Sequence, residues 1–299
     1  MPERVVPDAS IAQALDRASE RLAAAGLAGA RREATALWAA VAGKKPGDVW
    51  LSREEAPPPQ LLGRFGDAVA RRARGVPFAY VVGRVGFRTL DLRLDPRALI
   101  PRPETEELVG LVLKWAGSGA RAPGPGPRGI AADIGTGCGC IALALAVEGA
   151  FERVIAVERS AQAAALTREN VEFVHPRVPV EVREGDLLAP LAGVRCQVIV
   201  ANPPYLTTAE YAALDPAVRD FEPREALVSG VDGLEATRAL LAGAAACLVP
   251  QGLLAVEIDE RRAEPVRALA LGYSWDRVAV HEDLFGRPRF LLAFAKEEA

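Results

Sequence analysis

Sulfur and imidazole groups are scarce in this chain of 299 residues, which has four cysteines, two histidines and one methionine. Cys138 and Cys140 form a C-x-C pair inside a glycine-rich segment, but no second pair stands at zinc-site spacing. The histidines, His175 and His281, are isolated from that pair. We therefore expect no metal site, and we interpret the cysteines as small, reduced core residues of a cytoplasmic protein.

Long apolar runs and a strong charge of one sign are also missing. The N-terminus lacks the basic-then-apolar order of a signal peptide, and no apolar run is long enough to span a bilayer. A formal net charge of −3 gives no electrostatic footprint for nonspecific nucleic-acid binding. Half of the residues are hydrophobic, so a sizeable core is available, and the length suggests two domains. We expect a monomer with no membrane and no direct nucleic-acid partner.

Helical periodicity with almost no strand signal runs from Ser10 to about Arg74. Ser10 can cap a first helix that stops at Gly26, and further helices are expected from Arg31 to Ala42 and from Gln60 to Arg74. Residues 1–77 are therefore predicted to form a small N-terminal helical bundle. Such a bundle is either a packing domain or a docking module.

The remaining chain changes to strands. Short β-type runs at Tyr80–Val82 and Phe87–Leu94 predict a hairpin linker over residues 78–98. Residues 99–299 then alternate strands with helices, interrupted by a loop rich in glycine and proline at Gly117–Gly129. This order predicts an α/β fold, a doubly wound and mainly parallel sheet with an antiparallel edge made by its last strands. Those strands are expected at Ile130–Ile134, Val154–Glu158, Val178–Val182, Val198–Ala201, Leu253–Ile258, Arg277–His281 and Arg289–Phe294.

Two prolines, Pro101 and Pro103, make a rigid start to the first helix of this segment, whose first turn is rich in acidic residues, as the helix dipole favours. Arg102 and Glu104 alternate with these prolines. They either belong to the helix start alone or line a binding site.

A buried strand at Val198–Ala201 leads directly into Asn202, Pro203, Pro204 and Tyr205. Asn-Pro-Pro by itself is commonly a turn. At the carboxyl end of a strand, however, the asparagine oxygen and a rigid proline carbonyl can accept the two hydrogens of a planar –NH2 group, and the aromatic ring can cover its π-face. The stretch therefore points to recognition of an amide or a base.

The segment Asp133–Gly139 follows the first strand and opens a helix, as a ligand-binding glycine loop does. Cys140 stands where a dinucleotide fingerprint would have its third glycine, so the spacing departs from that of NAD-binding proteins. Glu158 ends the second strand, where an acid can bind ribose hydroxyls, and Asp186 with Leu187 follows the third, where they can bind an adenine ring. One such acid could be an ordinary loop carboxylate, but three acids around one glycine loop, Asp133, Glu158 and Asp186, indicate a nucleoside site.

From Tyr80 onward the chain resembles the release-factor glutamine methyltransferases (the PrmC/HemK family). The resemblance implies a seven-stranded S-adenosylmethionine-dependent methyltransferase fold (Rossmann-like) behind a small N-terminal domain that docks the release factor. It rests on four blocks, Ile100–Glu106, Asp133–Leu143, Asn202–Tyr205 and Phe221–Leu227. One departure is visible: Glu257 is followed by Ile258-Asp259-Glu260, where the family often has a small or basic residue and then glycine.

The resemblance also implies roles. The cofactor would be S-adenosylmethionine, leaving as S-adenosylhomocysteine, and the partner a class-1 peptide release factor methylated on N5 of the glutamine in its Gly-Gly-Gln motif. Cofactor contacts are expected from Asp133, Gly135, Thr136, Gly137, Cys138, Gly139, Glu158, Arg159, Asp186, Leu187 and Asn202. Catalysis and substrate binding are expected from Asn202, Pro203, Pro204 and Tyr205, with Arg102 and Glu104 on the substrate side.

Three other functions fit the same motifs. A glutamine methyltransferase acting on a ribosomal protein would carry the same blocks. An adenine-N6 DNA methyltransferase shares Asn-Pro-Pro-Tyr but would need a target-recognition insert or a basic face, neither of which is apparent. A scaffold that binds the cofactor and methylates nothing would not need both the glycine loop and an intact Asn-Pro-Pro-Tyr.

Overall fold

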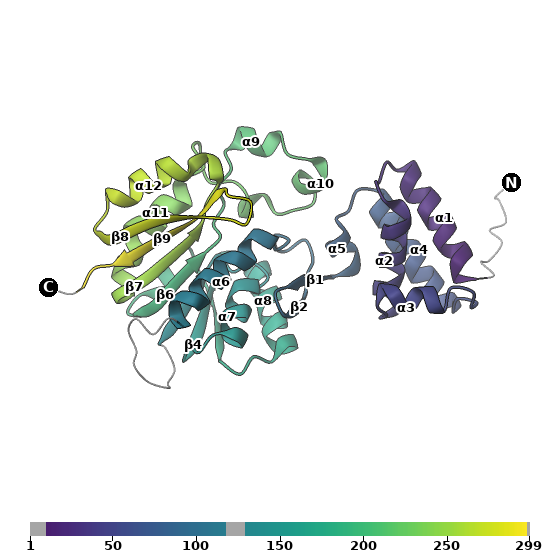
Figure 1. Cartoon of the computed structure of the whole chain (residues 1–299), viewed down its shortest axis with the longest axis horizontal. Coiled ribbons are helices and arrows are strands. Elements are labelled where there is room, and N and C mark those ends of the chain that lie inside the picture. Colours follow the sequence, from purple (N-terminus) through teal and green to yellow (C-terminus); the bar gives the residue numbers. More distant parts are fainter. Residues whose placement is uncertain (1–9, 118–128, 298–299) are drawn as a thin grey trace. The chain divides into compact units, whose positions relative to one another are not determined.

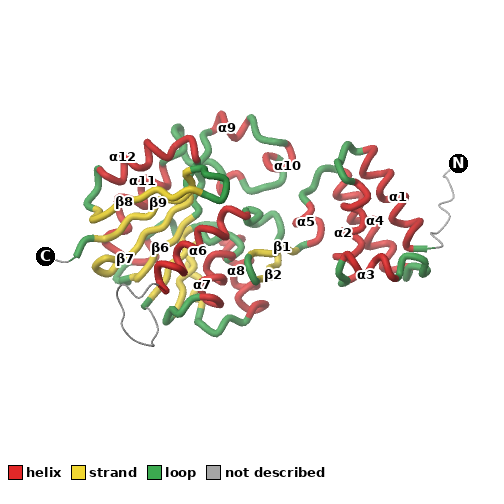
Figure 2. The backbone as a smooth tube through the Cα atoms, viewed as in Figure 1, coloured by secondary structure: helices red, strands yellow, loops and turns green. Residues whose placement is uncertain are grey.

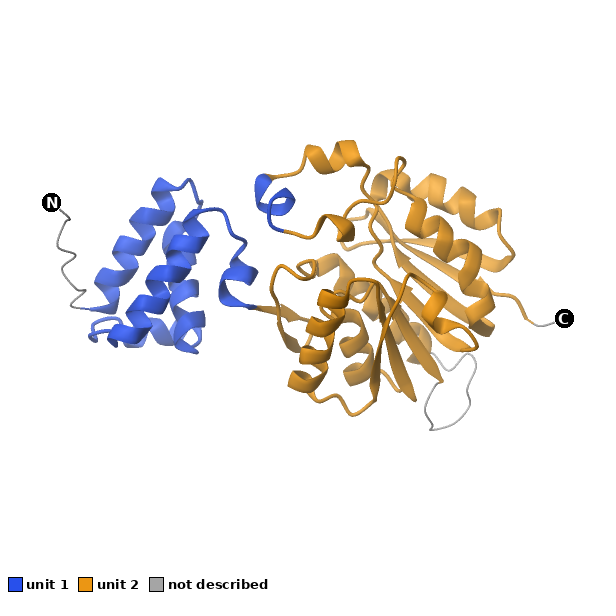
Figure 3. Ribbon diagram, turned by 180° about the vertical axis from the view of Figure 1, so that it is seen from behind, with its two compact units in different colours: residues 1–83, 216–221 blue, residues 84–215, 222–299 orange. Residues whose placement is uncertain are grey.

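The computed structural model of the protein describes residues 10–117 and 129–297. The chain divides into two compact units (Figure 3): unit 1 is Met1–Gly83 with Pro216–Phe221, and unit 2 is Arg84–Asp215 with Glu222–Ala299. Most of the loop expected at Gly117–Gly129 lies outside the described residues. Within the described ranges, no helix has the length and apolar character needed to cross a membrane.

Unit 1 is built from helices around its own apolar core. The Ser10 hydroxyl accepts a hydrogen bond from Gln13 N at the start of the first helix, as expected of a cap. In the core, the rings of Trp38 and Phe65 meet edge to face with centroids 4.9 Å apart. The helices of the N-terminal segment are α1 (Ile11–Ala24), α2 (Ala30–Ala42), α3 (Pro46–Leu51), α4 (Pro59–Ala73) and α5 (Phe78–Val82), and α10 (Pro216–Arg219) also belongs to this unit.

Two expectations for this region were wrong. The strand expected at Tyr80–Val82 is the short helix α5, framed by Pro77 and by Gly83, whose φ of 73° ends the helix. A short apolar run does not distinguish strand from helix by periodicity, and here the flanking residues decide. Helix α3 was not expected, because Pro46 was interpreted as a helix breaker. Proline is compatible with the first turn of a helix, however, and Pro46 lies in the first turn of α3.

Unit 2 opens with a hairpin of β1 (Arg84–Phe87) and β2 (Leu90–Arg93) and then forms a seven-stranded sheet in the order β5-β4-β3-β6-β7-β9-β8. The first five strands in this order are parallel, and β9 runs antiparallel between β7 and β8, which confirms the predicted sheet. The strands are β3 (Ile130–Ile134), β4 (Arg153–Glu158), β5 (Val180–Glu184), β6 (Cys196–Ala201), β7 (Leu248–Glu257), β8 (Trp275–Glu282) and β9 (Pro288–Ala295).

Helices cover both faces of this sheet (Figures 1 and 2). Alternate strand residues such as Ile134 and Ala201 pack with Leu240 of α11 and Val266 of α12 in one core cluster, while α6, α7 and α8 cover the opposite face. The helices of unit 2 are α6 (Pro103–Gly117), α7 (Cys140–Glu148), α8 (Ala161–Val174), α9 (Thr208–Ala212), α11 (Glu235–Gly243) and α12 (Ala263–Leu271), with 3-10 turns η1 (Ala189–Leu191), η2 (Arg224–Ala226), η3 (Ala244–Cys247) and η4 (Glu260–Arg262).

The register brings four strand ends to one edge of the sheet. Ile134 pairs with Val157 and with Ala201, and Ala201 pairs with Val256, so β3, β4, β6 and β7 end side by side. The order of connection reverses between β3 and β6, since β4 and β5 extend the sheet on one side and β6 and β7 on the other. Open α/β sheets bind ligands at such a reversal, outside the carboxyl ends of the strands.

Candidate functional site

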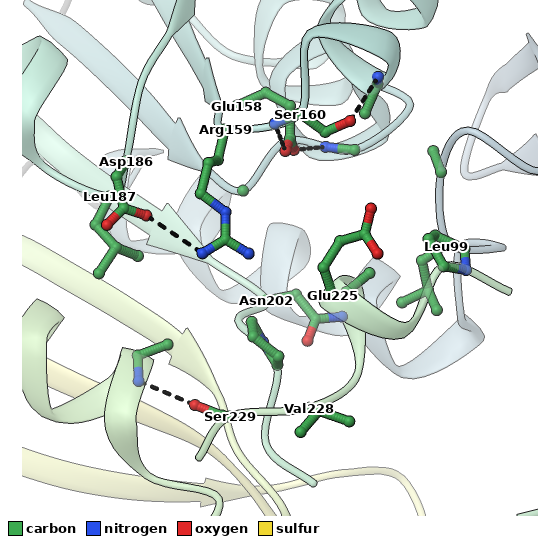
Figure 4. Close-up of a pocket in the computed structure, with 18 of the residues that line it drawn as sticks. Leu99, Glu158, Arg159, Ser160, Asp186, Leu187, Asn202, Glu225, Val228 and Ser229 are labelled. Atoms are coloured by element: carbon green, nitrogen blue, oxygen red, sulfur yellow. Dashed lines mark hydrogen bonds and ion pairs between the residues drawn. The ribbon is translucent and has the colours of Figure 1, made fainter. Parts of the chain in front are cut away.

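A cavity of about 670 Å³ lies at this reversal point (Figure 4). This volume lies within the range of small-molecule and cofactor sites. Eight of the expected site residues line the cavity: Gly135, Gly137, Glu158, Arg159, Asp186, Leu187, Asn202 and Pro204. Eight others do not line it: Arg102, Glu104, Asp133, Thr136, Cys138, Gly139, Pro203 and Tyr205.

The glycine loop after β3 is shaped by backbone conformations that favour glycine. Gly135, Gly137 and Gly139 have φ values of 72°, 59° and 87°. A Cβ atom on Gly139 would lie 2.9 Å from Cγ2 of Thr167, so a side chain there would also displace α8. The loop thus brings its backbone close to the cavity at Gly135 and Gly137, while Gly139 packs against the helix behind it.

Two polar side chains of α8 hold this loop from behind, and neither was expected from the sequence. Thr167 Oγ1 donates to the Gly137 carbonyl (2.8 Å), and Asn170 Nδ2 donates to the Cys138 carbonyl (2.8 Å). Both side chains are fully buried. Their spacing of three residues on one buried helix face was the signal that could have found them.

Asp133 and Thr136 support the loop from beneath. The Thr136 hydroxyl and the Ala142 amide of α7 both donate to Asp133 Oδ2. Asp133 is fully buried, and burial raises the pKa of its carboxyl to about 7, against the effect of these two hydrogen bonds. Asp133 and Thr136 therefore hold the loop between β3 and α7, and neither lines the cavity, so the cofactor contacts expected from them stay a prediction.

Glu158 ends β4 with its carboxylate held by two backbone amides. Gly137 N donates to Oε2 and Ser160 N donates to Oε1, each at 2.9 Å. Figure 4 shows both bonds beside the cavity. Each carboxylate oxygen has further lone pairs, so the group can still accept hydrogen bonds from a vicinal diol such as that of a ribose.

Asp186 and Leu187 lie at the end of β5, where the backbone is strained. Leu187 has a φ of 45°, an uncommon conformation for a residue with a side chain. The exposed Arg159 guanidinium lies 3.9 Å from Asp186 Oδ1 (Figure 4). The acid, the base and the apolar side chain together form a wall suited to the polar edge and the flat face of a heteroaromatic ring.

Asn202 follows β6 and is anchored by its side-chain nitrogen. Its Nδ2 donates to Thr105 Oγ1 (3.0 Å), and Thr105 Oγ1 donates to Glu257 Oε2 (2.7 Å). Within the described part of the chain, Asn202 Oδ1 accepts no hydrogen bond. Its oxygen is the acceptor that remains for a ligand of the cavity.

The rest of the Asn-Pro-Pro-Tyr stretch is packed rather than open. Tyr205 is partly buried, and burial raises the pKa of its hydroxyl to about 12, so it stays neutral. Leu206 bridges to Val228 just beyond it, which ties this stretch to the segment after η2. Among the four residues, Asn202 and Pro204 contact the cavity directly.

Arg102 and Glu104 are not among the residues that line the cavity. Arg102 Nη2 donates to Glu222 Oε1 (2.7 Å), and the Ile100 amide donates to Glu222 Oε2 (3.2 Å). Glu222 is 5% exposed and joins the segment before α6 to the segment that carries η2. The Arg102 side chain, which is 32% exposed, is thus held by Glu222, and the substrate contact expected of it stays a prediction.

The segment after Glu222 contributes cavity residues that sequence reasoning missed. Glu225 is exposed, and its side chain is directed toward the cavity (Figure 4). Ser229 accepts a hydrogen bond from the Ala236 amide and so positions α11 at the cavity wall. The Phe221–Leu227 block pointed to this segment but not to these side chains. The other residues missed are Arg97, Ala98, Leu99, Ser160, Ala163, Gly185, Pro223, Ala226, Val228, Glu235, Ala236 and Ala239.

The departure noted after β7 has a local structural role. Asp259 caps η4 through the Arg261 amide (2.8 Å) and pairs with the side chains of Arg261 and Arg262. None of these residues lines the cavity. The altered sequence therefore changes a turn beside the site and not the site itself.

Two family models match the chain. The model described as PrmC N-terminal domain matches residues 13–83, and the model described as Methyltransferase small domain matches residues 124–219. Among curated proteins, the chain is 39% identical to the release factor glutamine methyltransferase of Moorella thermoacetica, covering 97% of this chain and 100% of that protein. It is also 39% identical to the protein of the same name from Deinococcus radiodurans, covering 93% and 96%.

Solved structures share the fold at low sequence identity. A methyltransferase from Pyrococcus furiosus matches with a TM-score of 0.52 at 19% identity, covering 78% of this chain and 100% of that chain. The Thermus thermophilus 16S rRNA N2 G1207 methyltransferase, solved with S-adenosylmethionine and guanosine, matches with a TM-score of 0.51 at 16% identity, covering 72% and 50%. These likenesses identify the fold of unit 2 as that of methyltransferases.

Proposed function

Because the chain belongs to the release factor glutamine methyltransferase family, an S-adenosylmethionine-dependent family of enzymes, we propose that it methylates N5 of the glutamine in the Gly-Gly-Gln motif of class-1 peptide release factors. The observation that carries this proposal is the orientation of Asn202, whose anchored nitrogen leaves the oxygen free to accept from an –NH2 group. The reaction would serve translation termination and take place in the cytoplasm, with the enzyme acting as a monomer.

The cavity residues fit S-adenosylmethionine by their chemistry. Glu158 would hold the ribose diol, because two amides preorganise its carboxylate. Asp186 and Leu187 would hold the adenine, and Gly135 and Gly137 would pass beside the methionine part, where a side chain would obstruct it. When bound, the cofactor supplies an electrophilic methyl group on a sulfonium centre.

The protein's part in the reaction is to present the amide nitrogen of the substrate. That nitrogen is a poor nucleophile because its lone pair is delocalised into the carbonyl. Asn202 Oδ1 and the Pro203 carbonyl would accept its two hydrogens, which directs the lone pair and favours pyramidalisation as positive charge develops. The nitrogen gains a methyl group and loses one proton, which becomes acidic only after the methyl group is attached. No general base is needed before transfer.

In this proposal, unit 1 binds the release factor. Unit 1 has its own apolar core, and none of its described residues lines the cavity; in this proposal its helices dock the body of the release factor while unit 2 receives the glutamine. Arg102 and Glu104 would act on the substrate side only indirectly, through Glu222 and Glu257.

The test is methyl transfer to a purified class-1 release factor, followed by intact-mass and peptide spectrometry. One added methyl group on the Gly-Gly-Gln glutamine is the expected result, with a release factor carrying alanine at that glutamine as the control. Transfer only to a ribosomal protein or to DNA would contradict the proposed substrate. Cofactor binding without transfer to any of these would favour a scaffold.

A further inference from the structure

Two buried residues stand directly behind Asn202. Thr105, in the first turn of α6, is 2% exposed, and Glu257, the last residue of β7, is 1% exposed. Both are buried, and neither is among the residues that line the cavity. They form a continuous chain of hydrogen bonds from Asn202 Nδ2 to Thr105 Oγ1 and from Thr105 Oγ1 to Glu257 Oε2.

The direction of these bonds follows from how many hydrogens each group carries. The Thr105 hydroxyl has one hydrogen, and it is donated to the Glu257 carboxylate, which can only accept. The Thr105 oxygen therefore offers Asn202 an acceptor and no donor. If the Asn202 amide were turned over, its oxygen would face the Thr105 oxygen with no hydrogen between them, and a buried acceptor would be left unsatisfied.

We propose that Thr105 and Glu257 are positioning residues that hold the Asn202 amide with its oxygen toward the cavity, as transfer to an –NH2 group requires. The inference rests on the proposed function, because only a substrate that presents an –NH2 group needs an acceptor at this point. The two residues select between the two orientations of one side chain. They act through Asn202 and take no direct part in methyl transfer.

Substitutions of Thr105 can test the role of its hydroxyl separately from the role of the side chain's volume. Thr105→Val keeps the shape of the side chain but removes the acceptor for Asn202, and we expect turnover to fall roughly 10²-fold, the cost of misplacing a reacting group. The dissociation constant for S-adenosylhomocysteine should change less than twofold, because most of the contacts expected for the cofactor, such as those of Glu158 and Asp186, do not involve Asn202. Thr105→Ser restores the hydroxyl and should recover most of the turnover. Equal losses in the two variants would overturn the proposal.

The orientation of Asn202 can be observed without any substrate. The chain contains two asparagines, Asn170 and Asn202, so labelling with ¹⁵N-asparagine gives two side-chain –NH2 signals in an NMR spectrum. Asn170 is a built-in reference, because its Nδ2 is held by the carbonyls of Arg93 and Cys138. Asn202→Asp assigns the signals.

We expect Thr105→Val to shift the Asn202 signal and to speed the exchange of its hydrogens with water, while Thr105→Ser and the Asn170 signal stay unchanged. An Asn202 signal that is the same in the wild type and in Thr105→Val would overturn the proposal. If the wild type transfers no methyl group to a release factor, the proposed function fails, but this measurement still decides whether Thr105 orients Asn202.

Discussion

At the scale of the residue, the proposed function depends on which atom of an amide faces the cavity. Asn202 has one oxygen and one nitrogen of nearly equal size, and only the hydrogen bond to Thr105 distinguishes them. Asn202 could be placed at the site because open α/β sheets bind ligands at the carboxyl ends of their strands. The partner that orients it lies 97 residues earlier in the chain. The position of the residue at the cavity was therefore predictable from sequence, whereas the reason for its orientation was not, and its role stays a prediction.

Replacing Asn202 should separate catalysis from cofactor binding. Asn202→Ala removes one of two acceptors for the substrate –NH2, and we expect turnover to fall by roughly 10² to 10³, as when one preorganised group at a reacting centre is lost. Binding of S-adenosylhomocysteine, measured by calorimetry, should weaken no more than a few-fold, since Glu158 and Asp186 remain. Parallel loss of turnover and binding would show that Asn202 serves mainly the cofactor.

Glu257 should make turnover depend on pH. Burial raises the pKa of its carboxyl to about 7. Below this pH the protonated carboxyl can donate to Thr105, whose hydrogen then points at Asn202 and favours the reversed amide. Turnover should therefore fall as pH decreases through about 7 and reach a plateau above it. The groups that influence Glu257 are Thr105, Arg289, Glu104, Arg102 and Tyr205.

The check is a pH profile of kcat from pH 5.5 to 8.5, with the range chosen at about 1.5 pH units on either side of that pKa. Glu257→Gln cannot titrate, so its profile should be flat where the wild type rises. Asp133 is the other carboxyl whose pKa burial raises to about 7, and Asp133→Asn is the matched control, expected to keep the wild-type profile. A wild-type profile retained in Glu257→Gln would assign the titration elsewhere.

At the scale of the element, the alternation of strands and helices was predictable because strands such as β4 and β6 are apolar runs with a polar residue, Glu158 or Asn202, at or just after their ends. Glu158 and Asp186 could be placed at one edge of the sheet for this reason alone. The hydrogen bonds that hold the glycine loop could not, because Asn170 joins Cys138 to Arg93 across three separate elements. Such contacts depend on how the layers pack, so the helical spacing of Thr167 and Asn170 could mark a shared helix face but not the carbonyls that the two side chains bind.

The glycine loop and helix α4 give a matched pair of glycine substitutions. Gly139→Ala places a Cβ at a φ of 87° and 2.9 Å from Thr167, so we expect lower thermal stability and at least tenfold weaker binding of S-adenosylhomocysteine. Gly66 lies exposed within α4 with open space around its Cα, and Gly66→Ala should stabilise the protein by roughly 0.5–1 kcal/mol.

Denaturant unfolding measures the stability of both variants, and calorimetry measures their binding of S-adenosylhomocysteine. Unchanged cofactor binding in Gly139→Ala would mean that the loop adapts and that its backbone conformation is not required. Destabilisation by Gly66→Ala would mean that the glycine has a role outside helix propensity.

At the scale of the whole molecule, the two units have separate apolar cores, and the residues expected to hold the cofactor belong to unit 2. A ligand stabilises the part of a protein that must be folded to bind it, by about 2.7 kcal/mol at a concentration 100 times its dissociation constant. We therefore expect S-adenosylhomocysteine to slow hydrogen exchange in β3, β4, α7 and the Asn202 segment. Exchange in α1, α2 and α4 should not change.

Hydrogen-exchange mass spectrometry with and without S-adenosylhomocysteine measures this directly, and Gly139→Ala provides a variant in which protection of unit 2 should shrink. Protection confined to unit 2 would mean that each unit opens independently, so that unit 1 can bind its partner before or after the cofactor. Equal protection in both units would mean that the chain opens as one cooperative body. In that case cofactor binding would also strengthen binding of the release factor, since a coupling between two ligands is reciprocal.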